Sequence, residues 1–280
     1  MKKNIILIIK GMIIGLANVI PGVSGGTLMI TLGIYEQVID TISHIRTNLK
    51  NNLKFIIPLV IGIGLSLLLF SKIIGMSLEH FPLATTLFFL GLIIGGIPLL
   101  IKNINKNKDA KKISNYVIAF ISFAFIILFA MLKSGSDVNL SNVSFLNMII
   151  LFMVGIIASA TMVIPGISGS FVLMLLGYYK PIIDTVRGLT NFNLLFHNVL
   201  ILGIFGIGVL LGIVLVSKLI ELLLHKFETK TYYAVLGFVL ASCIAIIKPL
   251  FYINFSILEM LIGIVLFLIG YVFAYRISRD

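Results

Sequence analysis

The sequence VIPGVSGG at residues 19–26 returns as VIPGISGS at residues 163–170, 144 positions later. The match continues beyond these stretches, and 12 of the 25 residues at positions 18–42 are identical to their counterparts. Apolar composition alone would match isoleucines and leucines by chance, but it would not reproduce proline, glycine, serine, tyrosine and aspartate in one order. The sequence therefore predicts an internal duplication within a single domain of residues 1–280, with repeats over about 1–140 and 141–280.

The composition places this duplication in a membrane. Hydrophobic residues make up 60% of the 280 residues and charged residues 11%, and the mean hydropathy is +1.18, which is far too apolar for a soluble domain. Apolar runs of sufficient length to cross about 30 Å of hydrocarbon occur at residues 55–74, 85–101, 113–132, 197–217, 232–247 and 257–275. The sequence predicts an all-α polytopic membrane protein.

Few residues have the chemistry of a metal, cofactor or catalytic site. The single cysteine, Cys243, lies inside an apolar run, and the four histidines do not have the paired spacing of a metal site. We therefore expect no metal, no cofactor and no catalytic residue. The net charge of +11 is expected to reflect orientation in the membrane rather than binding to nucleic acid.

Two apolar arms flank each copy of the motif, at residues 5–18 and 26–41 and at residues 145–162 and 170–185. At about 1.5 Å per residue each arm is shorter than a full crossing, and the proline of each motif interrupts the helix. Each repeat is therefore interpreted as a re-entrant helical hairpin followed by three transmembrane helices. Because three crossings are odd in number, the two repeats are predicted to have inverted topology.

The distribution of basic residues supports one orientation of this plan. With the N-terminus inside, 16 of the 21 lysines and arginines fall on the inner side, and the five on the outer side are Lys72, Lys133, Lys180, Arg187 and Lys248. Positive residues concentrate on the cytoplasmic side of membrane proteins. We therefore expect both termini in the cytoplasm.

The two motif loops have the features of an anion site. Non-helical backbone at membrane depth is tolerated where it lines a wet cavity or is buried in protein, and helices beginning at about Ser24 and Ser168 would direct unpaired N–H groups and the positive end of the dipole at the break. The residues predicted to bind a phosphate headgroup are Asn18, Gly22, Ser24, Gly25, Gly26, Thr27, Gly166, Ser168, Gly169 and Ser170. The serines could instead be simple helix N-caps.

Charged residues beside the apolar arms form a second predicted group, for coupling or headgroup access: Glu36 and Asp40 at the inner end of the first hairpin, and Lys180, Asp184 and Arg187 at the outer end of the second. Asp40 and Asp184 either carry protons or cap loops. Lys180 and Arg187 either gather an anionic headgroup or place their charges at the interface. Glu36 and Lys180 occupy one repeat position with opposite charge.

Two further groups are expected to have structural roles. Small residues permit close helix packing in membranes, which is the role expected of Gly11, Gly15, Gly62, Gly64, Gly91, Gly95, Gly206, Gly208 and Gly212. Tyrosines are enriched at membrane interfaces, and the sequence is interpreted as using Tyr35, Tyr178 and Tyr179 as anchors there.

At these motifs the chain resembles the bacterial polyprenyl-phosphate transporter family, the PopT-type undecaprenyl-phosphate translocases. The resemblance rests on NVIPGVSGGT at residues 18–27, on IPGISGSF at residues 164–171 and on the duplicated layout, and it covers essentially the whole chain. It implies a flippase that returns undecaprenyl phosphate, the lipid carrier of peptidoglycan precursors, from the outer to the inner leaflet of the cytoplasmic membrane. The partners would be this lipid and the membrane lipids, and protons, sodium ions or a downhill gradient stay open as the driving force.

Two alternatives remain. Undecaprenyl-pyrophosphate phosphatases also have inverted repeats and re-entrant hairpins, but they carry an arginine where this chain has Gly25 and Gly169. Phosphoryl transfer needs stabilisation of charge by arginine, lysine or metal, so an enzyme is not expected. A carrier of a small soluble anion would fit the motif loops equally well.

Overall fold

The computed structural model describes residues 2–19, 24–44, 49–106, 109–132, 135–140, 144–166, 168–188, 194–252 and 254–277. Every regular element within these residues is helical, which confirms the predicted all-α class. The elements are α1 (Lys2–Val19), α2 (Gly25–Thr31), α3 (Tyr35–Ser43), α4 (Leu49–His80), α5 (Pro82–Asn105), α6 (Ile113–Phe129), α7 (Phe145–Val163), α8 (Gly169–Leu175), α9 (Tyr179–Arg187), α10 (Leu195–Ile247), the 3-10 helix η3 (Lys248–Tyr252) and α11 (Ile257–Ile277).

Five of the described helices are long and apolar enough to cross a membrane: α4, α5, α7, α10 and α11. Large apolar side chains on the outer surface are widely exposed, among them Phe120 at 70%, Leu210 at 67% and Val265 at 56%. Soluble proteins rarely expose apolar surface on this scale, and lipid is the environment that suits it. The chain is an integral membrane protein.

The helix lengths differ from the sequence expectation in two places. The arm at residues 145–162 was expected to be too short to cross, but α7 has 19 residues and meets the length of a crossing. The run at residues 113–132 was expected to cross, but α6 ends at Phe129 and has 17 residues. The N–H of Ala130 still bonds to a carbonyl four residues earlier, whereas the N–H groups of Met131 and Leu132 bond to carbonyls three residues earlier, so the α-helix ends there.

Each second arm, expected as one helix, is broken into two. The seven-residue helices α2 and α8 both end at a Leu-Gly pair, where Gly33 and Gly177 have φ of 70° and 74°. The same closing hydrogen bond follows in both copies, from Ile34 N–H to the Met29 carbonyl and from Tyr178 N–H to that of Leu173. This Schellman motif ends a helix at a glycine in the left-handed conformation, so α3 and α9 start in new directions.

Matched geometry also appears far beyond the motif. Phe81 separates α4 from α5 with φ/ψ of −135°/59°, and Phe227 interrupts α10 with φ/ψ of −136°/45°. The hydroxyl of Thr85 then donates to the Ser77 carbonyl, and that of Thr231 to the Leu223 carbonyl. The part of α10 before Phe227 therefore corresponds to α4, and the part after it to α5, which accounts for the two runs predicted there.

Glycines bring the helices of each half together. α1 packs on α4, and α7 packs on α10. A Cβ atom on Gly62 would collide with the Ile8 carbonyl oxygen, and one on Gly208 with that of Phe152. The expected packing role is confirmed for Gly62 and Gly208, and in the same way for Gly11, Gly15, Gly91, Gly95 and Gly212. It is wrong for Gly64 and Gly206, because a Cβ atom there meets nothing within 4 Å.

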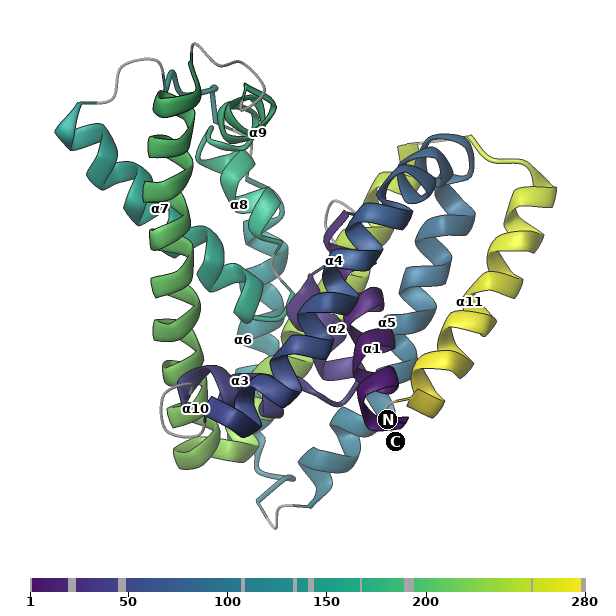
Figure 1. The fold of residues 1–280 in the computed structure, drawn as a ribbon. Coiled ribbons are helices and arrows are strands. Elements are labelled where there is room, and N and C mark those ends of the chain that lie inside the picture. Colours follow the sequence, from purple (N-terminus) through teal and green to yellow (C-terminus); the bar gives the residue numbers. More distant parts are fainter. Residues whose placement is uncertain are drawn as a thin grey trace.

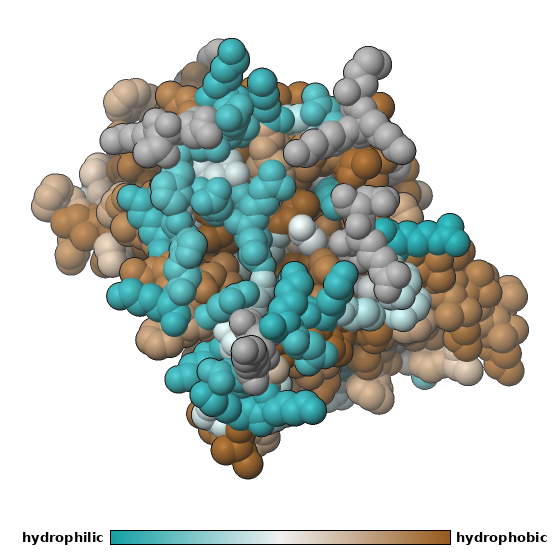
Figure 2. Space-filling view, turned by 90° about the horizontal axis from the view of Figure 1, so that it is seen from below, coloured by the Kyte–Doolittle hydropathy of each residue, from teal (hydrophilic) through white to brown (hydrophobic). Residues whose placement is uncertain are grey.

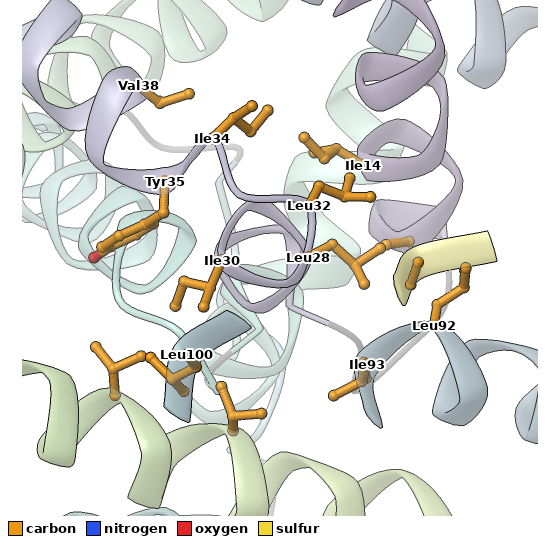
Figure 3. Packing of buried hydrophobic residues seen from close by; sticks show 14 of the residues in the cluster. Ile14, Leu28, Ile30, Leu32, Ile34, Tyr35, Val38, Leu92, Ile93 and Leu100 are labelled. Carbon is orange, nitrogen blue, oxygen red and sulfur yellow. The ribbon is translucent and has the colours of Figure 1, made fainter. Parts of the chain in front are cut away.

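The short helix α2 lies in the interior. Leu28 is fully buried, and Ile30 is 7% exposed. Figure 3 shows these two side chains among neighbours that include Ile14 of α1 and Ile93 of α5. The first motif copy is therefore held by apolar packing on several sides.

The helices α3 and α9 lie at opposite ends of the molecule, with α3 at the end where both termini lie (Figure 1). Figure 2 views that end face-on and shows hydrophilic side chains gathered over its centre, with hydrophobic side chains towards the periphery. This distribution suits a molecule whose polar end faces water and whose flanks face lipid.

Candidate functional site

The two copies of the motif meet. The backbone N–H of Gly166 donates to Oγ1 of Thr27 at 2.8 Å, and the hydroxyl of Tyr35 donates to the Val163 carbonyl at 3.1 Å. Thr27 is fully buried, and a Cβ atom on Gly26 would lie 3.1 Å from the carbonyl oxygens of Met162 and Val163. The start of α2 and the second motif loop are therefore parts of one site.

Ser24 and Ser168 occupy matching positions at the starts of α2 and α8. Their φ/ψ values are −96°/126° and −93°/129°, and both are N-cap residues, so the helix starts agree with the sequence prediction. Neither side chain makes a cap hydrogen bond. The two serines therefore occupy the N-cap position of their helices, as the alternative interpretation expected, but their hydroxyl groups do not cap the helix.

The hydroxyl groups of the two motif copies have different partners. Oγ of Ser168 lies 2.7 Å from Oγ of Ser170. Ser24 is 2% exposed, and its Oγ has no hydrogen-bond partner among the described residues. Burying a hydroxyl without a partner costs about 1–3 kcal/mol, so the Ser24 hydroxyl is a donor that a bound ligand could satisfy.

The glycines of the motif are placed where side chains would interfere. Gly25, Gly26 and Gly169 are buried in the first turns of α2 and α8. Gly166 has φ of 86°, and a Cβ atom there would lie 2.7 Å from the Phe238 carbonyl oxygen. Gly22 and the side chains of Asn18 and Arg187, which the sequence also assigns to sites, lie outside the part of the chain that the structure describes.

A polar pocket of about 530 Å³ adjoins the junction of α2 and α3. Its lining includes Glu36, Asp40, Asn103, Lys106 and Glu228. Glu36 lies on α3, which is too short to cross a membrane. Desolvation and the Glu228 carboxylate raise the pKa of Glu36, while Lys106 lowers it. The carboxyl group of Glu36 therefore binds a proton more readily than an ordinary glutamate.

A second pocket, of about 610 Å³, adjoins α9. Its lining includes Asp137, Lys180, Asp184, His197 and Asn198, and Nζ of Lys180 lies 3.7 Å from Oδ2 of Asp137. Because α3 and α9 lie at opposite ends of the molecule (Figure 1), the charged residues line two separate pockets, which agrees with their expected placement at the ends of two different hairpins. Glu36 and Asp40 share one pocket, and Lys180 and Asp184 share the other.

Sequence reasoning missed the burial of three residues, Tyr35, Tyr178 and Lys10. Tyr35 was interpreted as an interfacial anchor, but it is 6% exposed and bonds to the second motif copy; Tyr178, at 9%, is likewise buried. The repeated Leu-Gly-x-Tyr pattern was the available signal for Tyr35, whereas Tyr178 stands at the variable position of that pattern, opposite Ile34 of the first copy. Lys10 is 5% exposed within α1, and a buried cation in a membrane protein usually has a function, which the apolar pattern around it concealed.

Comparison with known proteins supplies the family. Residues 14–254 match the family model described as Undecaprenyl phosphate translocase-like. The chain is 32% identical over 275 residues to the polyprenyl-phosphate transporter of Staphylococcus aureus (strain NCTC 8325 / PS 47), covering 97% of this chain and 95% of that protein. It is 31% identical over 248 residues to the polyprenyl-phosphate transporter of Vibrio cholerae serotype O1 (strain ATCC 39315 / El Tor Inaba N16961), and this match covers 84% of this chain and 74% of that protein.

No solved structure matches the chain. The family match spans most of the sequence, and both relatives align over most of their own length. The names of the family and of these relatives describe transport and not catalysis. The chain therefore belongs to the undecaprenyl phosphate translocase-like family, as a transporter rather than an enzyme.

Proposed function

We propose that this protein is a flippase that returns undecaprenyl phosphate from the outer to the inner leaflet of the bacterial cytoplasmic membrane. The contact between the two motif copies, made by Gly166 N–H and Oγ1 of Thr27, is the observation that carries the proposal. It gathers hydroxyl and backbone donors from both halves of the chain in one buried place. The polyprenyl-phosphate transporters of S. aureus and V. cholerae support the choice of lipid.

The headgroup binds to neutral donors. Ser24 Oγ supplies a hydroxyl that has no partner among the described residues, and Ser168 with Ser170 supplies a second hydroxyl pair. Backbone N–H groups at Gly25, Gly26 and Gly169 add donors at the helix starts, together with Thr27, Gly22 and Asn18 around the loops. The N–H of Gly166 is engaged by Oγ1 of Thr27 and holds the two loops together. Hydrogen bonds from these donors to an ionised phosphate are charge-assisted because the acceptor carries the charge, so neutral donors are sufficient to hold the headgroup.

The proposed topology is two inverted repeats, over about 1–140 and 141–280, each with a helical hairpin and three transmembrane helices, and with both termini in the cytoplasm. The first hairpin is proposed to be re-entrant, whereas α7 of the second is long enough to cross. The placement of α3 and α9 at opposite ends of the molecule supports the inverted arrangement (Figure 1), as does a pocket beside each of them. Transport proceeds by alternating exposure of the motif site to the two sides.

The two pockets have different tasks in this scheme. Lys180 and Arg187 collect the anionic headgroup at the outer side, and Asp184, the counterpart of Asp40, carries a proton or caps a loop there. Glu36 and Asp40 at the inner side couple transport to a cation, and a proton is favoured there because desolvation and Glu228 raise the pKa of Glu36.

The test is leaflet-resolved transport of undecaprenyl phosphate in proteoliposomes, followed by access of the headgroup to an external phosphate-binding reagent. We expect protein-dependent movement that is lost in a Ser24→Ala/Ser168→Ala double variant. Ser217→Ala is the matched control, because Ser217 is also a buried hydroxyl without a partner among the described residues but lies on α10 outside the motifs.

Two further measurements separate the alternatives. Uptake of inorganic phosphate without movement of the lipid would assign the protein to carriers of small soluble anions. Release of phosphate from undecaprenyl pyrophosphate would assign it to phosphatases. If the Ser24→Ala/Ser168→Ala double variant transports the lipid as fast as the Ser217→Ala control and wild type, the motif hydroxyls have no part in the mechanism.

A further inference from the structure

Three side chains that can ligate metals, Asp40, His44 and Glu221, meet where α3 lies against α10, and His225 lies beside Glu221. Nδ1 of His44 lies 3.3 Å from Oδ1 of Asp40 and 3.3 Å from Oε1 of Glu221, and Nε2 of His225 lies 3.8 Å from the same Glu221 oxygen. Asp40 and His44 are one helical turn apart, and so are Glu221 and His225. Each pair therefore presents a carboxylate and an imidazole from one face of its own helical segment.

The distances match the coordination shell of a transition metal. Zinc bonds of about 2.0–2.1 Å in a tetrahedron separate neighbouring ligand atoms by about 3.3 Å. The two His44 distances have that value, and the donor atoms of Asp40, His44 and Glu221 all lie within 4.8 Å of one another. Mixed imidazole and carboxylate ligands favour zinc and similar ions over magnesium and calcium, which prefer oxygen alone.

The surroundings add negative charge. A pocket of about 370 Å³ is lined by Asp40, Glu221 and His225 together with Glu36 and Glu228. Grouped carboxylates attract cations to a cleft, and the side chains of Asp40 and His44 are 70% and 50% exposed, so an ion can reach them from water. The Glu221 side chain, at 17%, anchors the cluster to α10.

We propose that Asp40, His44 and Glu221 form a binding site for a divalent transition-metal ion, with Zn²⁺ preferred, that joins α3 to α10, and that His225 is an outer partner of Glu221. The ion would connect a short helix of the first half of the chain to a long helix of the second half, at the edge of the pocket that holds Glu36. Binding to ligands on both helices would stabilise the arrangement in which they are in contact. Without metal, the same distances would be direct contacts of the His44 ring with two carboxylates, and the experiments separate these two cases.

The first experiment measures binding of Zn²⁺ to the purified full-length protein in detergent, in competition with a chromogenic chelator. We expect one equivalent to bind, with affinity reduced at least about tenfold in His44→Gln and in His225→Gln, as loss of even an outer partner of a metal ligand has that effect. His80→Gln is the control, because His80 is an exposed histidine at the end of α4 whose Nδ1 lies 3.1 Å from the Met76 carbonyl. Absence of stoichiometric binding, or an equal loss in His80→Gln, would overturn the proposal.

The second experiment measures hydrogen exchange in α3 and in the segment of α10 around residues 218–226, with and without Zn²⁺. Slower exchange of both segments in wild type, and no change in His44→Gln, is the expected result. If lowering the pH alone slows exchange and Zn²⁺ adds nothing, the cluster is an ion-paired histidine and not a metal site. Circular dichroism of the metal-free variants establishes that they are folded, so a loss of binding cannot come from unfolding.

Discussion

At the scale of single residues, the motif hydroxyls fall into two kinds that behave differently when removed. Thr27 Oγ1 accepts a hydrogen bond from Gly166 N–H, whereas Ser24 Oγ has no partner among the described residues. Thr27→Val would leave a buried N–H unsatisfied, which costs about 1–3 kcal/mol, while Ser24→Ala removes a hydroxyl that gains nothing from its surroundings. We therefore expect Thr27→Val to lower the unfolding temperature and Ser24→Ala to leave it unchanged or slightly raised.

The chain carries its own reporter for this comparison. Cys243 is the single cysteine and is 9% exposed, so a thiol-reactive fluorophore labels it as the protein unfolds on heating. Ser24→Ala should weaken binding of the lipid phosphate although its unfolding temperature is retained. Equal destabilisation by the two substitutions would mean that the Ser24 hydroxyl supports the fold, and the case for it as a ligand donor would be lost.

The sequence indicated these residues but not their pairing. Proline, glycine and serine at matched positions were enough to predict that helices begin at Ser24 and Ser168, and the structure confirms both starts. The bond between Thr27 and Gly166 joins residues 139 positions apart. It depends on how α2 packs among α1, α5 and α7, and no local pattern encodes that approach.

At the scale of helices, two pairs of glycines provide matched tests of packing. Gly62 and Gly208 face carbonyl oxygens of α1 and α7, whereas Gly64 and Gly206, two residues away on the same helices, face open space. Alanine at Gly62 or Gly208 must push the helices apart, and overpacking of this kind costs about 1–3 kcal/mol. Alanine at Gly64 or Gly206 should be neutral or stabilising by up to about 1 kcal/mol, because alanine is the better helix former.

Thermal unfolding followed through Cys243 measures these four variants. Gly62→Ala and Gly208→Ala are expected to unfold at lower temperature than wild type, and Gly64→Ala and Gly206→Ala at the same or a higher temperature. Similar values for all four would mean that the facing backbones yield without cost, and the helix pairs would then not depend on close contact.

Helix boundaries were predictable where a local signal exists. The break after α2 and α8 could have been read from the repeated Leu-Gly pair, because glycine after a helix followed by an apolar residue is the usual Schellman pattern. Phe81 and Phe227 lie far from the motif, and they are recognised as equivalent because their backbone φ and ψ angles are similar. Many apolar side chains are interchangeable where a helix faces lipid. Comparing the two halves of the sequence therefore does not reveal that the helix break at Phe81 is equivalent to the one at Phe227.

At the scale of the whole molecule, the two halves place opposite charges at opposite ends. Glu36 and Lys180 stand at one repeat position, yet each lines the pocket at its own end of the molecule (Figure 1). Attraction of an anionic headgroup to Lys180 and of a proton to Glu36 would give the two sides of the transporter different affinities, while the gradient of the coupled ion would set the direction of net transport.

The inverted arrangement can be tested directly by labelling. In a Cys243→Ser background, Lys180→Cys and Glu36→Cys each introduce one thiol at an exposed position. A membrane-impermeant maleimide added to intact cells should label Lys180→Cys at once, and it should label Glu36→Cys only after the membrane is permeabilised. The reason is that the proposed topology places three crossings between the ends of the two hairpins, so the two positions would open to different compartments. Labelling of both thiols from outside would place the two hairpins in the same orientation, and alternating exposure of a shared motif site would then have no structural basis.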